Sequence, residues 1–333
     1  MKNHYFKLAF ILFAGIVLIN FLQSSTPETQ DEKVYQDYFN KNYHIYALNH
    51  PERLDFAGEE VPLQLEDVRE RFDRELHVNA YWQSNTLFYL KRANKWFPVI
   101  EPVLKENNVP DDFKYLALVE SGLLQVVSPA GARGFWQFRE SAATEFGLEV
   151  SKEVDERYHV EKATEAACKY LKKAKEKFGS WTMAAASYNV GMRGLQNQVD
   201  RQKEDYYHNL LLNEETSRYV FRILAAKEIL SHPGTYGFHY RDEHLYKPLR
   251  FQIIEVDTAV KDWAVFAQDL GINYKTLKLL NPWLRQSYLY NRDKKTYEIK
   301  VPVEDDLAKF VLPRKNKVQT QTSATAPNDS LSH

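Results

Sequence analysis

The fold of this chain is decided by residues 112–122, which read DFKYLALVESG. Phe113, Leu116, Ala117 and Glu120 are spaced i, i+3, i+4 and i+7, so a helix places all four on one apolar face. The glycine that follows ends such a helix. The spacing therefore predicts a short buried helix whose last turn carries a carboxylate on its apolar side.

A carboxylate in that position has a chemical use. Burial raises the pKa of a glutamic acid above its usual ~4.3, and a group that donates a proton near neutral pH needs such a rise. Because the helix stops at Gly122, Glu120 is expected at the edge of a cavity. Spacing alone leaves the alternative open that Glu120 faces solvent or pairs with a Lys or Arg.

A second informative segment is residues 128–138, which read SPAGARGFWQF. Its small residues permit tight backbone turns, and it ends in the cluster Trp136-Gln137-Phe138. Aromatic faces cover the C–H surfaces of sugars, and amides pair with hydroxyl or N-acetyl groups. The composition indicates a sugar-binding loop, although the same residues could equally belong to a hydrophobic core.

Motifs in a fixed order make the pattern specific. They are ES at 120–121, GARG at 131–134 running into WQF at 136–138, ASYNVG at 186–191 and ETSRYV at 215–220. This series resembles the catalytic domain of the soluble-lytic-transglycosylase type, which has a lysozyme-like helical fold, over about residues 64–240. The chain departs from that family at Arg139-Glu140 and at Ser187 and Val190. These departures concern the substrate cleft more than the chemistry.

The resemblance assigns roles to seven residues. It implies that Glu120 is the catalytic acid and base. Substrate-binding residues would be Ser121, Gln137, Phe138, Tyr188, Asn189 and Tyr219, with Tyr219 hydrogen-bonded near Glu120. Tyr188 also shares a helical face with apolar residues, so its spacing by itself is compatible with core packing.

The reaction that the resemblance implies is cleavage of the β-1,4 bond between N-acetylmuramic acid and N-acetylglucosamine in peptidoglycan, with formation of a 1,6-anhydro end. A single glutamate suits this reaction. Asp111 and Asp112 lie roughly 12–14 Å from Glu120 along one helix, at about 1.5 Å per residue, so they are poor partners. A distant carboxylate such as Asp155 or Glu156 could still fold close to it.

Two other functions compete with this reading. One is a peptidoglycan hydrolase like the goose-type lysozymes, and the other is a glycan-binding protein without activity. No His-Glu-x-x-His pattern occurs among the 10 histidines, and we predict neither a metal site nor a cofactor. The net charge of −1 gives no general attraction to nucleic acid, so no nucleic-acid partner is expected.

The fold class predicted is mainly α, with a small β-α-α-β module at the C-terminal side. Strands are expected at 251–256 and 296–302, with two short helices between them. This module, residues 248–312, loosely resembles the LysM peptidoglycan-binding module. Further helices are expected near 86–107, broken or kinked around Pro98, and at 111–121, 139–146, 160–178, 181–190 and 215–231.

The two ends of the chain differ from its centre. Residues 1–23 carry basic residues and then an apolar run of about 15, typical of a signal peptide or an N-terminal membrane anchor. We therefore expect export to the periplasm or cell envelope, with inner- or outer-membrane association through this segment as one alternative. Residues 24–63 are predicted to be a linker and lead-in, and 313–333 a disordered tail. The single cysteine, Cys168, is expected to pack inside a helix.

Overall fold

The computed structural model describes residues 30–42 and 44–306. The predicted signal or anchor at 1–23 and the tail at 313–333 lie outside these residues. The chain divides into two compact units, 1–47 and 48–333. The first contains helix α2 (Gln30–Asn42), where the polar composition predicted an unstructured linker. In the part of the chain that is described, no helix has the length and apolar character needed to cross a membrane.

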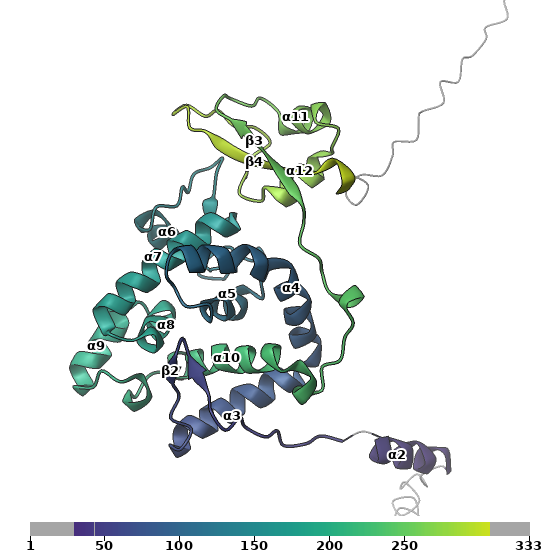
Figure 1. Ribbon diagram of the computed structural model, residues 1–333, viewed down its shortest axis with the longest axis vertical. Helices are drawn as coiled ribbons and strands as arrows, with labels where there is room; N and C mark the ends of the chain where they lie inside the picture. Colours follow the sequence, from purple (N-terminus) through teal and green to yellow (C-terminus); the bar gives the residue numbers. More distant parts are fainter. Residues whose placement is uncertain (1–29, 43, 307–333) are drawn as a thin grey trace, which may run out of the picture. The chain divides into compact units, whose positions relative to one another are not determined.

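The second unit is mainly helical, as predicted (Figure 1). Its larger part, here called the catalytic body, contains the helices α3 (Glu66–Tyr81), α4 (Gln83–Glu106), α5 (Phe113–Ser121), α6 (Glu140–Glu145), α7 (Val160–Phe178), α8 (Trp181–Val190), α9 (Met192–Gln202) and α10 (Glu214–Ser231). Sequence periodicity located six of these, whereas α3 and α9 were not singled out.

A break or kink was expected around Pro98, and because helix α4 is continuous the break does not occur. Pro98 and Pro102 lie one turn apart, and both are exposed. A proline in a helix frees the carbonyl four residues earlier, and water can satisfy that group on an exposed face. The helix therefore tolerates both prolines.

Helix α5 is the central element of the catalytic body. Phe113, Leu116, Ala117 and Leu118 are completely buried, and the helix packs against α4 and α10. Figure 1 shows α5 in the middle of the surrounding helices. Burial on nearly all sides explains why this helix is rich in apolar residues. Cys168 is also fully buried, as expected, and burial raises the pKa of its thiol to about 12.

The lead-in segment predicted at 24–63 contains residues that pack against the catalytic body. A two-stranded hairpin, β1 (Asp55–Phe56) and β2 (Glu59–Glu60), precedes α3. Phe56 is fully buried and packs edge-on against Phe113, with 5.1 Å between ring centroids. Glu59 accepts hydrogen bonds from the backbone N–H groups of Trp181 (2.6 Å) and Thr182 (2.8 Å) at the start of α8. These contacts join positions far apart in the sequence, so side-chain periodicity along the chain does not reveal them.

The smaller part, here called the C-terminal module, has the predicted β-α-α-β order. It consists of β3 (Phe251–Val256), α11 (Trp263–Asp269), α12 (Tyr274–Leu280) and β4 (Tyr297–Pro302). The strands pair antiparallel, from Phe251 opposite Pro302 to Val256 opposite Tyr297. Trp263 and Ile299 are fully buried in a separate apolar cluster between the sheet and the helices.

Residues 153–161 of the catalytic body hold the C-terminal module. Val154 forms an isolated β-bridge with Leu284, and the Asp155 N–H donates to the Trp283 carbonyl at 2.9 Å. The guanidinium of Arg285 lies 4.2 Å from the centroid of the Tyr158 ring. Val154 and Tyr158 belong to the apolar cluster of the module. The two parts therefore share buried surface as well as hydrogen bonds.

Candidate active site

The end of α5 fixes the position of Glu120. Gly122 adopts φ +60°, and its N–H donates to the Leu118 carbonyl at 2.7 Å, which closes the helix. Arg92 donates to the Gly122 carbonyl at 2.6 Å, and a Cβ on Gly122 would lie 3.0 Å from that guanidinium. Glycine meets both requirements without strain, because it has no Cβ. Glu120 thus stands at the last turn of a buried helix, and the residue as a whole is partly exposed.

The protonation of Glu120 follows from its surroundings. Burial is the largest influence and raises its pKa from 4.5 to about 7. The hydroxyl of Tyr219, on α10, donates a short hydrogen bond to Oε1 of Glu120 and lowers the pKa. Glu215 raises it through charge repulsion, and Arg222 lowers it. A carboxyl group with a pKa near neutrality can donate a proton in one step and accept one in the next.

Glu215 and Arg222 are residues that the sequence argument missed. Arg222 binds Glu215 with two hydrogen bonds of 2.7 and 3.1 Å. The buried Glu75 of α3 lies 3.8 Å from Nε of Arg222 and accepts a 2.6 Å hydrogen bond from Arg218. Glu215 and Tyr219 are four residues apart on α10, a spacing that places both on the face toward Glu120. That spacing was a signal that could have found Glu215.

The loop of residues 126–138 is held in place by Arg157. Its guanidinium forms two 2.8 Å hydrogen bonds with Asp155, and Nη1 lies 3.5 Å from the carbonyls of Gly131 and Phe138. Gly134 has φ +77°, and a Cβ there would come within 1.9 Å of the Arg157 carbonyl oxygen. Glycine is therefore required where the loop crosses this segment.

Gln137 and Ser121, two of the predicted binding residues, form hydrogen bonds with the backbone of the loop and of the end of α5. Gln137, at φ +49°, donates from Nε2 to the carbonyls of Gly134 (2.7 Å) and Val126 (3.2 Å). The hydroxyl of Ser121 donates to the Ala117 carbonyl and accepts from the N–H of Leu123, both at 3.1 Å. Their direct contact with a substrate remains a prediction.

Tyr188 and Asn189 lie at the end of α8. The Tyr188 hydroxyl donates to the Trp136 carbonyl at 2.7 Å, and its ring packs on Tyr170 and on the buried Phe138, at centroid distances of 5.0 and 6.0 Å. Tyr188 is close enough to Glu120 for the carboxylate charge to raise the pKa of its phenol, after the larger effect of burial. Asn189 accepts a 2.8 Å hydrogen bond from Thr216 of α10.

The other carboxylates considered from the sequence have different partners. Asp112 accepts from the Ala57 N–H at 2.7 Å and pairs with Lys227 at 2.8 Å. Asp155 binds Arg157, as described for the loop. Glu156 accepts from the N–H of Glu149 at 2.8 Å and pairs with Lys162 at 2.5 Å. Glu215 is therefore the acid whose charge acts on Glu120.

A carboxyl group at the end of a buried helix, with a tyrosine hydroxyl hydrogen-bonded to it, is chemically suited to proton transfer. Residues 97–211 match the model of the transglycosylase SLT domain, and residues 252–305 match that of the soluble lytic transglycosylase C-terminal LysM-like domain. The chain thus carries an SLT transglycosylase domain followed by a LysM-like domain.

Two curated proteins of the same name are similar to this chain. The chain is 28% identical over 243 residues to membrane-bound lytic murein transglycosylase D of Escherichia coli strain K12, covering 70% of this chain and 52% of that protein. The protein of the same name from E. coli O6:H1 strain CFT073 gives the same figures. The chain therefore spans about half the length of these curated relatives.

Proposed function

We propose that this protein is a lytic transglycosylase that cleaves the glycan strands of peptidoglycan, with Glu120 as its acid and base. The observation that carries the proposal is the Glu120 carboxyl group, held at the end of a buried helix within a matched SLT domain and hydrogen-bonded by Tyr219. Its pKa of about 7 leaves a large protonated fraction at neutral pH.

The proposed reaction has two stages. Glu120 first donates its proton to the oxygen that links N-acetylmuramic acid to N-acetylglucosamine, and the bond from that oxygen to the muramoyl C1 breaks. The acetamido group of the substrate assists at C1. The Glu120 carboxylate then takes the proton of the muramoyl C6 hydroxyl, whose oxygen bonds to C1 and closes the 1,6-anhydro ring. Glu120 is protonated again at the end, so one carboxyl group serves both stages.

The surrounding residues would support this cycle in different ways. The Tyr219 hydroxyl stabilises the carboxylate that exists between the two stages, because it donates to the charged form. Asn189, held by Thr216, would bind N-acetyl or hydroxyl groups of the substrate. The roles of Ser121 and Gln137 would be to shape the helix end and the loop beside the substrate. Phe138 and Tyr188 would form the packed wall of the cleft.

The proposed setting is the cell envelope, where peptidoglycan is found. The LysM-like module would contribute to glycan binding there. The membrane-bound description belongs to the relatives, and association of this chain with a membrane through residues 1–23 remains part of the proposal.

A hydrolase is the second candidate, and Glu215 is the observation that favours it. Its carboxylate acts on Glu120 and could activate a water, as the second acid of a glycosidase does. Two contacts oppose this role, because Arg222 binds both carboxylate oxygens of Glu215. The single-glutamate reaction needs no such second base.

Product mass and two matched variants test the proposal. Purified sacculi are digested with wild type, Glu120→Gln and Glu215→Gln, and the released muropeptides are weighed by mass spectrometry. We expect anhydro products, lighter by one water than hydrolysed ends, from wild type and Glu215→Gln, and no turnover by Glu120→Gln. Hydrolysed ends together with an inactive Glu215→Gln would establish the hydrolase instead. Normal turnover by Glu120→Gln would refute the assignment of Glu120.

A further inference from the structure

We propose that Arg157 is a positioning residue of the reaction, through which the C-terminal module sets the shape of the loop beside Glu120. Residues 153–161, here called the junction segment, contact the loop of residues 126–138 on one side and the module on the other. The reaction is the one proposed for Glu120, whereas the connection between loop and module rests on its own contacts.

The side chain of Arg157 holds the loop through a buried ion pair. The side chains of Arg157 and Asp155 are both 2% exposed, and two 2.8 Å hydrogen bonds join them. Nη1 of Arg157 faces the carbonyls of Gly131 and Phe138, at 3.5 Å from each. Arg133 of the loop donates to the same Asp155 carboxylate at 3.2 Å. A guanidinium can serve a carboxylate and loop carbonyls together, because its donors point in fixed and different directions.

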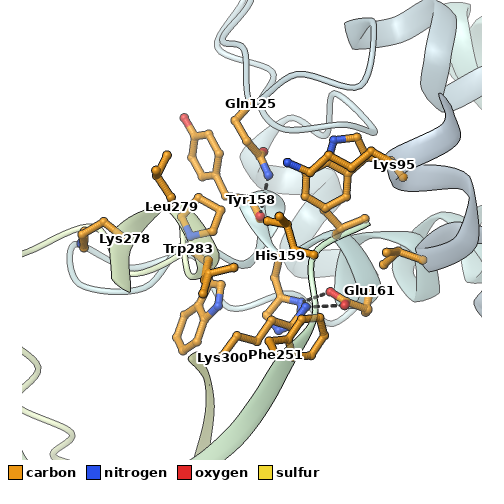
Figure 2. A pocket seen from close by; sticks show the side chains of 16 residues that line it. Lys95, Gln125, Tyr158, His159, Glu161, Phe251, Lys278, Leu279, Trp283 and Lys300 are labelled. Atoms are coloured by element: carbon orange, nitrogen blue, oxygen red, sulfur yellow. Dashed lines mark hydrogen bonds and ion pairs between the residues drawn. The ribbon is translucent and has the colours of Figure 1, made fainter. Parts of the chain in front are cut away.

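The backbone of the junction segment fixes the loop as well. The Tyr158 carbonyl accepts a 2.9 Å hydrogen bond from Nε2 of Gln125, which immediately precedes the loop. The Arg157 carbonyl lies so close to Gly134 that a Cβ there would come within 1.9 Å of its oxygen. In Figure 2, Tyr158 lies between Gln125 and Trp283 of the module. A shift of the junction segment would therefore displace the loop at its start and in its middle.

The loop reaches the site of Glu120 through Tyr188. The Trp136 carbonyl accepts the 2.7 Å hydrogen bond of the Tyr188 hydroxyl, and the Phe138 ring packs on the Tyr188 ring at a centroid distance of 6.0 Å. Burial, and after it the charge of Glu120, raise the pKa of the Tyr188 phenol, so the ring lies near the carboxylate. A displaced loop would move this wall of the proposed cleft, and a misplacement of about 1 Å can cost about a hundredfold in rate.

The C-terminal module holds the opposite side of the junction segment. The Asp155 N–H donates to the Trp283 carbonyl at 2.9 Å, and the Arg285 N–H donates to the Glu153 carbonyl at 2.7 Å. Tyr158 is 4% exposed and belongs to the apolar cluster of the module. The guanidinium of Arg285 lies 4.2 Å from the centroid of its ring. Asp155 thus binds the module with its N–H group and two arginines beside the loop with its carboxylate.

The test is a double-mutant cycle in the full-length protein, with Arg157→Lys in the junction segment and Arg285→Gln in the module. The assay measures kcat and KM on a soluble peptidoglycan tetrasaccharide, on which attachment of the module to an extended cell wall gives no advantage. We expect kcat to fall about tenfold in Arg157→Lys, since lysine lacks the planar fork, and about threefold in Arg285→Gln. In the double variant kcat should equal that of Arg157→Lys, because the connection is already broken.

Amide hydrogen exchange gives a measurement that does not depend on turnover. The N–H groups of Ser128, Arg133 and Gly134 donate to carbonyls within the loop, so their exchange reports on its order. Arg285→Gln should raise the exchange rates of the loop about threefold, because Arg285 acts on the junction segment that holds it.

Arg292→Gln is the matched control. Arg292 is also an exposed arginine of the module, but its guanidinium lies 5.9 Å from the centroid of Tyr290, within the module itself. This variant should keep the kcat and the loop exchange of wild type.

Two results would overturn the proposal. One is a pair of effects on kcat that multiply in the double variant, to about thirtyfold, and the other is loop exchange that Arg285→Gln leaves unchanged. The exchange measurement needs only a surface substitution, so it decides even where Arg157→Lys fails to fold. An inactive wild type whose loop exchange responds to Arg285→Gln would refute the proposed function and support the connection between loop and module. An active wild type without that response would do the reverse.

Discussion

Replacing Tyr219 by phenylalanine should move the pH dependence of the enzyme toward higher pH. The Tyr219 hydroxyl donates to the Glu120 carboxylate and lowers its pKa, against the larger effect of burial. A hydrogen bond to a charged group contributes about 1.5–3 kcal/mol. Because one pKa unit corresponds to about 1.36 kcal/mol, its loss should raise the pKa of Glu120 by about one to two units above its value of about 7.

The direction of the effect on activity follows from the first stage of the proposed reaction. Glu120 must be protonated to donate to the glycosidic oxygen, so activity declines as the pH rises through its pKa. The assay measures the initial rate of muropeptide release from sacculi at limiting substrate over a range of pH. In Tyr219→Phe the alkaline decline should begin about one to two pH units later than in wild type.

A matched variant separates this effect from a general disturbance of the site. Tyr188 is a partly buried tyrosine whose hydroxyl donates to the Trp136 carbonyl and makes no hydrogen bond with Glu120. Tyr188→Phe should therefore leave the alkaline decline where it is, even if the maximum rate falls. An unchanged or lowered pH of the decline in Tyr219→Phe would show that the hydrogen bond does not control the pKa of Glu120.

Three further predictions concern stability, each measured by urea denaturation. The raised pKa of Glu120 means that wild type loses stability as the pH rises through about 7. Glu120→Gln should therefore be more stable than wild type by about 1–2 kcal/mol near pH 8, allowing for partial accessibility, and equally stable near pH 4. A stability difference that stays the same at both pH values would contradict the reasoning. In Gly134→Ala the free energy of unfolding should fall by more than about 2 kcal/mol, because the new Cβ would meet the Arg157 carbonyl. Gly131→Ala is the control and should lose less, because Gly131 has a similar φ of +79° but no atom within 4 Å of an added Cβ. Glu59→Ala should cost about 1–2 kcal/mol, since it removes the acceptor for the first N–H groups of α8, and an unchanged midpoint would argue against this contact.

Patterns of apolar residues along the sequence predicted many of the helices and strands. The apolar spacing around Phe113 and Leu116 predicted α5, and two short segments rich in β-branched and aromatic residues predicted β3 and β4. Such elements are set by side-chain periodicity, which can be read along the chain. The break expected at Pro98 did not occur, because the consequence of a proline depends on whether solvent can reach the freed carbonyl.

The sequence by itself determined that Glu120 lies on the apolar face of a helix ended by Gly122. The apolar spacing could not say how strongly the carboxyl group is desolvated. The expectation that Tyr219 lies near Glu120 came from the family resemblance, because 99 positions separate the two residues in the sequence. The roles of Glu215 and Glu59 were likewise decided only by the tertiary structure, in which α10 faces α5 and the hairpin meets α8. The physical reason is that periodicity is a property of neighbours in sequence. The raised pKa of Glu120 and the ion pair of Glu215 with Arg222 depend on groups that only the folded chain brings together.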